Sequence, residues 1–259
     1  MSKGRRYTQQ FKKAEERRLS KKIGIIGDVH AEDTLLAMAI DWLEKKNVDV
    51  IICTGDIADG LGDINAACNI LASNAVLTVA GNHDRWLLTG KARHVENAHY
   101  KSAVHDRNLQ FLDELPKTLS LPIHCGDLLL CHGVLDDDLA KIWPGTTETE
   151  VKRSLSFDKL LSQSSNVPSF VVNGHMHFRT LIDFEACKLI NAGTLKGLYS
   201  GLSILDLDAQ TLNGFDFAPG GMILPSQNHL VSRSDGRRVW RDTQAFEGHW
   251  EPVVLHQSN

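Results

Sequence analysis

Long apolar runs are missing from this sequence of 259 residues. Its densest apolar stretch, Val48–Cys53, is interrupted by Asp49 and falls far short of the ~18 apolar residues of a membrane span. The basic residues near the N-terminus are not followed by the apolar stretch of a secretory signal. We therefore expect no membrane association and no export. A hydrophobic content of 42% and a charged content of 23% exclude a disordered or collagen-like chain and are typical of a soluble globular protein.

Cysteine is also scarce, and its spacing includes no C-x-x-C pair. An odd number of five predicts buried, reduced thiols rather than a disulfide framework: Cys53, Cys68, Cys125, Cys131 and Cys187. Reduced thiols indicate a reducing compartment, so we expect the protein in the cytoplasm. The length allows one large domain or two small ones, and a chain of this length can bury a core without disulfides or a second subunit.

Charge is spread unevenly along the chain. Residues 1–22 hold nine basic side chains against Glu15 and Glu16, a net charge of +7, which leaves −11 for the remainder. A basic leader could contact nucleic acid or another anionic surface, although terminal charge blocks are most often simply solvated. The acidic body argues against a large nucleic-acid interface, so nucleic acid is not the favoured partner. The residues do not indicate an oligomeric state.

Strand-like and helix-like segments alternate through the first two-thirds of the chain. A buried strand at 22–27 precedes a helix at 33–46 with Asp33 as its N-cap. Further elements are expected at 49–53 (strand), 63–72 (helix), 75–80 (strand), 102–115 (helix), 119–124 and 127–131 (hairpin), 148–161 (helix) and 169–173 (strand). The initial β-α-β-α-β order implies parallel strands. From residue 178 the pattern is antiparallel, with strands at 178–183, 188–191 and 200–207.

These elements predict an α/β domain over residues 22–207. A basic N-terminal extension would occupy residues 1–21. Residues 208–259 contain Pro219, Pro225 and the Gly220-Gly221 pair, and they favour an irregular C-terminal extension or a loose hairpin packed on the domain.

Polar side chains with metal-ligand chemistry follow each strand where it ends. Seven of them are imidazole, carboxylate or amide groups: Asp28, His30, Asp56, Asn82, His132, His175 and His177. Because ligands bind outside the carboxyl ends of strands in open α/β sheets, we expect all seven at one rim. Imidazole favours transition metals and carboxylate or amide oxygen favours harder ions, so the mixture suits Mn, Fe, Zn or Ni. Seven ligands exceed one tetrahedral site and fit two ions that share a carboxylate, an arrangement that clamps a phosphate and activates a bridging water as a hydroxide for in-line attack.

The ordered blocks D-x-H, G-D-x-x-D, G-N-H-D, H-G and G-H-x-H resemble those of the calcineurin-like metallophosphoesterases. The resemblance extends from about residue 22 to residue 206 and includes Asn191–Thr194, which is similar to the Asn-Pro-Gly-Ser turn of many members. It implies a four-layer α/β/β/α sandwich of mixed sheets with a dimetal site at the C-terminal ends of the strands. In size, the chain is most similar to the small bacterial and archaeal phosphoesterases.

Carried over residue by residue, the resemblance implies the site. One divalent ion would be held by Asp28, His30 and His177, and Asp56 would bridge to the other. The second ion would be held by Asp56, Asn82, His132 and His175. His83 would be the general acid that protonates the leaving oxygen, or a clamp on the phosphate, with Asp84 holding its imidazole.

The substrate is less defined by the sequence. We expect a dimetal-dependent hydrolase of phosphomonoesters or phosphodiesters acting on small phosphorylated compounds, with nucleotides or nucleic-acid-derived esters among the candidates. Arg85 and Arg93 are the candidate phosphate contacts. Protein Ser/Thr phosphatase-like or dinucleoside polyphosphate hydrolase activity is the alternative. Members of those classes typically carry an Arg in a G-D-x-x-x-R-G block, and residues 55–60 (GDIADG) contain no Arg. A non-catalytic, metal-stabilised binding scaffold is the other alternative.

Some further polar residues are ambiguous. Asp59 could support a ligand or simply hold its loop. The seven remaining histidines match no position of the family pattern and are expected to be structural or on the surface: His94, His99, His105, His124, His229, His249 and His256.

Overall fold

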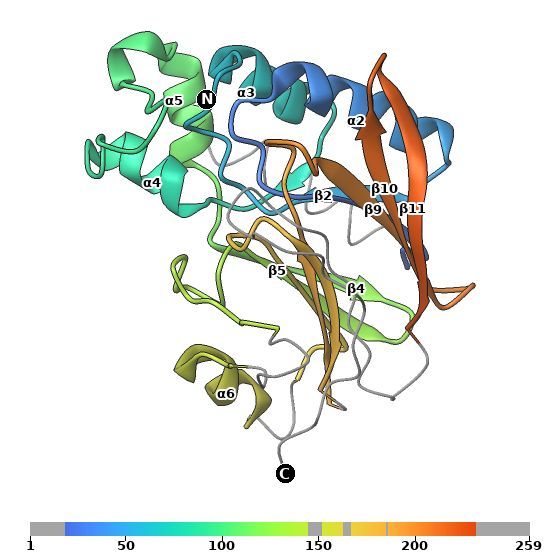
Figure 1. Cartoon of the computed structure of the whole chain (residues 1–259). Coiled ribbons are helices and arrows are strands. Elements are labelled where there is room, and N and C mark those ends of the chain that lie inside the picture. Colours follow the sequence, from blue (N-terminus) through green and yellow to red (C-terminus); the bar gives the residue numbers. More distant parts are fainter. Residues whose placement is uncertain (1–18, 145–151, 163–166, 185, 232–259) are drawn as a thin grey trace, which may run out of the picture.

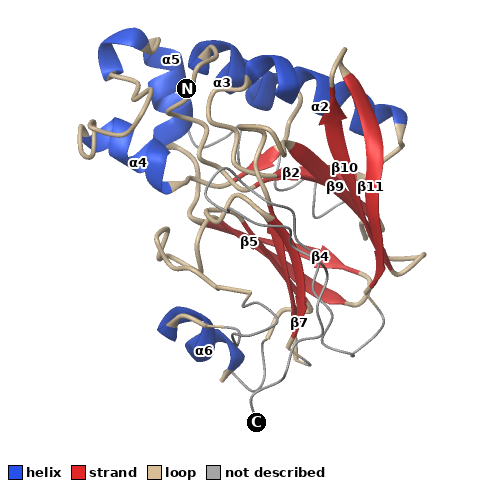
Figure 2. Ribbon diagram, viewed as in Figure 1, coloured by secondary structure: helices blue, strands red, loops and turns tan. Residues whose placement is uncertain are grey.

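Two stacked β-sheets form the centre of the protein (Figures 1 and 2). This computed structural model describes residues 19–144, 152–162, 167–184 and 186–231. The basic residues up to 18 and the tail from 232 onward lie outside the described residues, so most of both expected extensions does too. None of the helices in the described ranges has the length and apolar content that crossing a membrane requires.

The six-stranded sheet places the expected parallel strands at one edge. Its order is β11 (Met222–Leu230), β10 (Thr211–Ala218), β9 (Gly201–Asp206), β1 (Lys22–Ile26), β2 (Val50–Cys53) and β3 (Leu77–Thr78). β1, β2 and β3 are parallel, whereas β9, β10 and β11 join on the other side of β1 by antiparallel pairing. The parallel β-α-β-α-β core is thus confirmed, with a third strand shorter than expected.

The five-stranded sheet contains the expected hairpin. Its order is β4 (Thr118–Ile123), β5 (Gly126–Cys131), β6 (Phe170–Asn173), β8 (Lys188–Ala192) and β7 (Arg179–Asp183). β5, β6 and β8 run parallel, and β4 and β7 pair antiparallel at the two edges. The carboxyl ends of three parallel strands from each sheet therefore supply the loops of the site.

The helices cover the outer faces of the two sheets (Figure 1). On the six-stranded sheet lie α2 (Asp33–Lys45), α3 (Ile64–Ser73), α4 (Asn82–Thr89) and α5 (Asp106–Asp113), and on the other sheet lies α6 (Leu155–Leu161). α2 buries Leu36, Ala39, Ile40 and Leu43, the spacing of one helix face. Asp63 caps α3 by accepting from the backbone N–H of Asn65 and Ala66. Asp33 is not the cap of α2, because its carboxylate instead accepts from Asp63 N–H.

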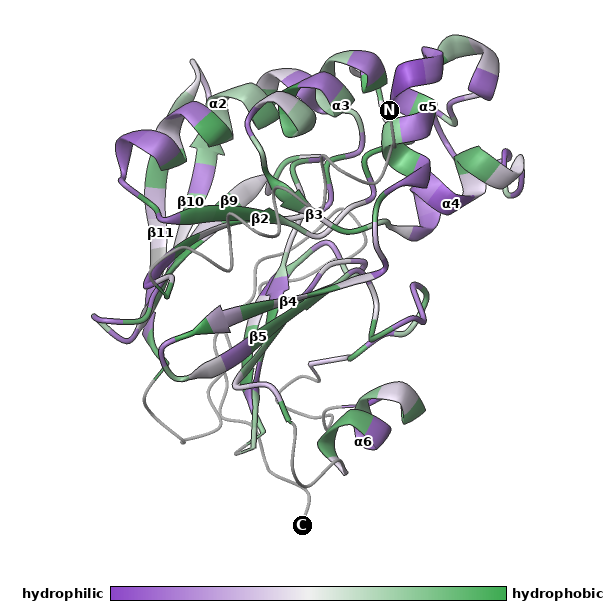
Figure 3. Cartoon of the chain, turned by 180° about the vertical axis from the view of Figure 1, so that it is seen from behind, coloured by the Kyte–Doolittle hydropathy of each residue, from purple (hydrophilic) through white to green (hydrophobic). Residues whose placement is uncertain are grey.

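Apolar side chains fill three separate interfaces, which makes four layers. One cluster joins α2, α3 and α5 to the six-stranded sheet, a second lies between the sheets, and a third joins the five-stranded sheet to α6. Figure 3 shows apolar residues along β2, β9 and β5 and hydrophilic stretches on α4 and α5. The expected α/β/β/α sandwich is confirmed.

Three segments differ from the sequence-based expectation. α4 was not expected, and the expected helix at 102–115 is a 3₁₀ turn (Lys101–Ala103) followed by α5. The expected helix at 148–161 is helical only over Leu155–Leu161 among its described residues. Of the two forms expected after residue 207, residues 208–231 adopt the hairpin, but it is not loose, because β10 pairs with β9 over six residues and β11 continues the sheet.

A buried arginine ties the added hairpin to the other sheet. Arg179 of β7 is 5% exposed, and its Nη1 donates to the carbonyl oxygens of Leu202 (3.1 Å) and Phe215 (2.8 Å). Its Nη2 forms an ion pair with Asp216 of β10. One guanidinium therefore satisfies two backbone carbonyls and a carboxylate where the two sheets meet.

Replacing this arginine should destabilise the fold. Arg179→Met keeps much of the apolar stem but removes the buried charge that pairs with Asp216 and a donor to two carbonyl oxygens, so we expect a loss of about 3 kcal/mol in the free energy of unfolding by urea. Lys45→Met is the control, because Lys45 forms only an exposed i,i+4 pair with Asp41 and should cost less than about 0.5 kcal/mol. Equal midpoints for the two variants would contradict this role of Arg179.

Candidate metal centre

All seven expected ligands lie at the rim where the carboxyl ends of the two sheets meet. Each follows a parallel strand or opens the helix after one: Asp28 and His30 after β1, Asp56 after β2, Asn82 at the start of α4 after β3, His132 after β5, and His175 and His177 after β6. These five strands are spread over residues 22–173, so only the folded sheets bring the seven groups together.

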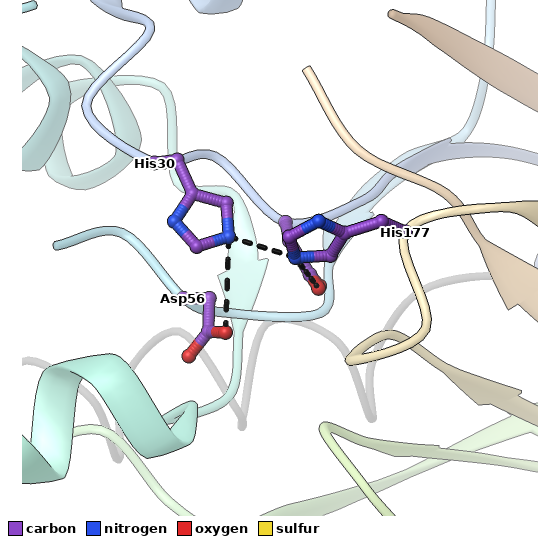
Figure 4. Close-up of side chains that lie close together, drawn as sticks. His30, Asp56 and His177 are labelled. Atoms are coloured by element: carbon purple, nitrogen blue, oxygen red, sulfur yellow. Dashed lines mark hydrogen bonds and ion pairs between the residues drawn. The ribbon is translucent and has the colours of Figure 1, made fainter. Parts of the chain in front are cut away.

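The first group of potential ligands consists of Asp28, His30, Asp56 and His177 (Figure 4). Their candidate ligand atoms all lie within 4.8 Å of one another. His30 Nε2 is 2.9 Å from His177 Nε2 and 3.9 Å from Asp56 Oδ2. His177 Nε2 is also 3.4 Å from Asp28 Oδ2. Two imidazoles and two carboxylates thus face one point.

The second group consists of Asp56, His132 and His175, again with candidate ligand atoms within 4.8 Å of one another. His132 Nε2 is 3.2 Å from Asp56 Oδ2 and 2.9 Å from the amide oxygen of Asn82. The ring centroid of His175 is 5.3 Å from that of His132. Asp56 belongs to both groups, so its carboxylate lies between them.

Neighbouring backbone and hydroxyl groups orient these ligands. Thr54 Oγ1 donates to Asp28 Oδ1 at 2.8 Å. The Nδ1 of His132 is 2.8 Å from the Thr54 carbonyl oxygen, and the Nδ1 of His30 is 2.9 Å from the Asp59 carbonyl oxygen. A ring that donates from Nδ1 to a carbonyl presents the Nε2 lone pair to the site, as metal-binding histidines commonly do.

The backbone around the ligands adopts a costly conformation. His30, Asp56, His175 and His177 have φ values of 45°, 45°, 67° and 60°, a region that residues other than glycine rarely occupy. Gly81 and Gly174 permit close approach, because a Cβ on either would collide with a carboxylate oxygen, that of Asp56 or Asp28 respectively. Strain of this kind clusters at functional sites.

Burial separates the pKa values of the cluster. Burial lowers the pKa of His30 and His175 to about 4 and raises the pKa of Asp28 to about 7. For His132, burial is outweighed by Asp56 and Asp28, which raise its pKa to about 10; in turn His132 counters the burial of Asp56 and lowers the pKa of that carboxyl. Neutral imidazoles retain the lone pair that a metal ion needs.

Two further observations indicate that these ligand atoms suit divalent cations. His30 and His177 point their Nε2 atoms at each other at hydrogen-bond distance. His175 Nε2 is buried and has no hydrogen-bond partner among the described residues, an unfavourable state for a polar atom. Imidazole nitrogens grouped with carboxylates suit divalent transition-metal ions.

His83 lies beside the first group and is oriented by Asp59. Its Nδ1 is 2.8 Å from Asp59 Oδ2, and its ring centroid is 4.9 Å from that of His30. The expectation that Asp84 holds this imidazole is wrong. Asp84 is buried and accepts from the backbone N–H groups of Ile57, Ala58 and Gly81, because it lies at the third position of α4 and faces back to the helix start.

The expected phosphate contacts are both engaged in ion pairs. Arg85 makes a two-point pair with Asp138, at 2.6 and 2.8 Å. Arg93 makes one with Asp59, at 2.8 and 2.9 Å. The backbone N–H of His99 also donates to Asp59, so a histidine expected to be merely structural belongs to the network behind His83.

Sequence reasoning missed these supporting residues for an identifiable reason. The available signal for Asp59 is its position as the second Asp of G-D-x-x-D. Asn191 belongs to the motif that resembles a family turn, and its amide donates to the Gly174 carbonyl oxygen at 2.7 Å. Thr54 and His99 carried no signal, because their contacts join distant parts of the chain.

Comparison with known proteins decides the family. Residues 22–210 match the sequence profile of the Calcineurin-like phosphoesterase superfamily domain. The chain belongs to this superfamily. The resemblance drawn from the ordered motifs is thereby confirmed, and membership makes the protein a metal-dependent hydrolase of the phosphoesterase class with a divalent metal site.

Several known proteins share the fold at low identity. A metallophosphoesterase from Sphaerobacter thermophilus is 20% identical, with a TM-score of 0.55 over 80% of this chain and 88% of that one. A hypothetical protein from Pyrococcus horikoshii is 11% identical, with a TM-score of 0.57 over 75% and 87% of the two chains. An uncharacterised protein from Methanocaldococcus jannaschii is 22% identical over 180 residues, which is 67% of this chain and 69% of that protein.

The shared position of Asp56 generates a prediction about metal content. Asp56→Asn should lower the total bound metal, measured by elemental analysis of the purified protein, more than His30→Ala or His175→Ala does. The reason is that Asp56 faces both groups, whereas each histidine faces one, and a neutral amide is a poor substitute for a shared carboxylate. Asp41→Asn, an exposed substitution of the same kind, is the control. A wild-type metal content in Asp56→Asn would contradict the assignment.

Proposed function

We propose that this protein hydrolyses phosphate esters, monoesters or diesters, at a centre of two divalent ions. In this proposal one ion is held by Asp28, His30 and His177, the other by Asn82, His132 and His175, and Asp56 is shared. The observation that carries the proposal is the membership of Asp56 in two adjacent ligand groups. Bound divalent ions there supply Lewis acidity and an activated water nucleophile.

The chain's own contribution to bond cleavage is proton donation by His83. Asp59 fixes the Nδ1 side of the imidazole, so the Nε2 side is available to the leaving oxygen. Burial disfavours a charged imidazole, but the hydrogen bond to Asp59 and the nearby Asp56 carboxylate outweigh it and raise the pKa of His83. A protonated imidazole at neutral pH is the form that a general acid requires.

The substrate is proposed to be a small phosphorylated compound, nucleotides included. We also propose a cytoplasmic location, which the five unpaired thiols support, four of them buried. Mn, Fe, Zn and Ni all suit the mixture of imidazole, carboxylate and amide donors.

Metal analysis and hydrolysis together test this function. Purified protein is expected to contain two divalent ions per chain and to hydrolyse p-nitrophenyl phosphate, bis(p-nitrophenyl) phosphate or both when supplied with Mn, Ni or Zn. Chelation should abolish the activity, and metal should restore it. Full metal content with no hydrolysis of either ester would overturn the enzymatic proposal and favour a binding scaffold.

The role of His83 predicts a dependence on the leaving group. His83→Ala should retain metal, since the backbone N–H that donates to Asp56 Oδ1 at 2.8 Å survives the substitution. Turnover of an alkyl or nucleoside phosphate should fall by about 10²–10⁴-fold, the usual worth of general acid catalysis. Turnover of p-nitrophenyl phosphate should fall much less, because nitrophenolate departs without a proton.

The control for this prediction is His105→Ala, an exposed histidine ahead of α5, which should behave as wild type. Equal losses on good and poor leaving groups would show that His83 acts as an electrostatic clamp on the phosphate rather than as an acid. Loss of metal from His83→Ala would show a structural role.

A further inference from the structure

The carboxylate that orients His83 is itself held from a second loop. Asp59 is fully buried, and besides its contact with His83 Nδ1 it accepts from the backbone N–H of His99 at 2.8 Å. Both terminal nitrogens of Arg93 also donate to it, at 2.8 and 2.9 Å. Each carboxylate oxygen therefore accepts two hydrogen bonds, and His83 makes only one of the four.

Arg93 fixes the plane of this carboxylate. Two parallel N–H bonds from one planar guanidinium hold both oxygens at once, which a single donor cannot do. The Arg93 side chain is 11% exposed; its Nε donates to the carbonyl oxygen of Lys91 and its Nη1 to that of His99, each at 2.7 Å. These contacts and the pair with Asp59 occupy most of its N–H groups, so the guanidinium serves Asp59 rather than a phosphate.

The chain that carries the proposed acid also returns to support it. His83 is the second residue of α4, and Arg93 lies in the loop that follows this helix. Gly90 ends α4 in the left-handed conformation, with a φ of 69°, which turns the chain out of the helix. The contacts then form a closed ring from His83 through Asp59 to Arg93. The direction of His83 Nε2 therefore depends on where Arg93 holds Asp59.

We propose that Arg93 is a positioning residue for protonation of the leaving group, acting through Asp59 on His83. This inference rests on the proposed phosphoesterase function, with His83 as its acid. Proton transfer requires the acid within hydrogen-bond reach of the leaving oxygen, and a misplacement of about 1 Å can cost up to ~10²-fold in rate. Arg93 forms no hydrogen bond or ion pair with any of the seven potential ligands, all of which are described residues, so metal binding is independent of it.

Steady-state kinetics of the metal-loaded protein tests this role. On an alkyl ester, mono or di according to what the wild type accepts, Arg93→Met should lower kcat about ten-fold or more. Its KM, its metal content and its turnover of the matching p-nitrophenyl ester should change little, because nitrophenolate departs without a proton. A loss of equal size on both esters would show a general structural role and overturn the proposal.

Two further arginine variants complete this comparison. Arg93→Lys should lose less than Arg93→Met, because an ammonium group keeps the charge but does not hold both oxygens in a plane. It carries the same test if Arg93→Met is unstable. The control is Arg153→Met, which removes the arginine–aspartate pair of Arg153 and Asp158 and should match the wild type on both esters.

A double variant shows whether Arg93 acts through Asp59. Asp59→Asn alone should also slow the alkyl ester selectively, because an amide replaces one acceptor oxygen with a donor. Adding Arg93→Met should then change kcat by less than about two-fold, since residues of one network are not additive. Losses that multiply, or a rise in KM for both esters, would make Arg93 an independent phosphate contact and overturn the proposal.

Nuclear magnetic resonance of the His83 ring gives a measurement that needs no turnover. In the zinc-loaded protein the His83 signals are those lost in His83→Ala. Arg93→Met should shift or broaden them, Arg93→Lys should do so less, and Arg153→Met should leave them in place. Unchanged His83 signals in Arg93→Met would overturn the proposal. If the wild type hydrolyses no ester, the proposed function fails, and these signals alone decide whether Arg93 positions His83.

Discussion

Two buried carboxylates control the structure of the site. Asp28 and Asp56 are 0% and 1% exposed. Burial, with a contribution from Asp56, raises the pKa of Asp28 to about 7, whereas His132 outweighs burial at Asp56 and lowers the pKa of that carboxyl. Neighbouring anions in a low-dielectric interior are stable only with cations close by. The ring of imidazoles, the hydroxyl of Thr54 and the left-handed backbone at His30 and Asp56 all arrange partners around this concentration of negative charge. Divalent ions bound between these ligands would satisfy the same requirement.

Asp59 connects the two chemical parts of the centre. Its carbonyl oxygen accepts from the ring of His30, a potential ligand, while its carboxylate holds His83, the proposed acid. Arg93 and His99 secure the other carboxylate contacts from the loop after α4. Because Asp59 positions both imidazoles, a displacement of the loop that carries Asp59 would move the proposed acid His83 and the potential ligand His30 together. The position of His83 relative to His30 therefore depends on the one loop that carries Asp59.

The common location of the seven potential ligands could be predicted because each lies just after the carboxyl end of a strand. Short apolar runs ending in Asp28, Asp56 or His132 are local patterns, and parallel strands bring their ends to one rim. α4 could not be predicted, because its eight residues carry few apolar side chains and show no clear helical period. The family resemblance implies that Asp84 holds His83, but adjacent helical residues point in different directions, and Asp59 makes this contact instead. The partners of Arg85 and Arg93 depend on long-range contacts, which no spacing reveals.

The hairpin of β10 and β11 has a consequence for where the folding unit ends. The family profile stops at residue 210, yet the six-stranded sheet continues to Leu230, and Arg179 finds three of its acceptors on β9 and β10. A chain shortened to the family boundary would retain every potential ligand and His83. It would also carry a bare β9 edge and would remove Asp216 and the Phe215 carbonyl oxygen from the buried guanidinium of Arg179. The region that matches the family profile and the folding unit of this protein therefore differ by one hairpin, and truncation should produce aggregation rather than a smaller working enzyme.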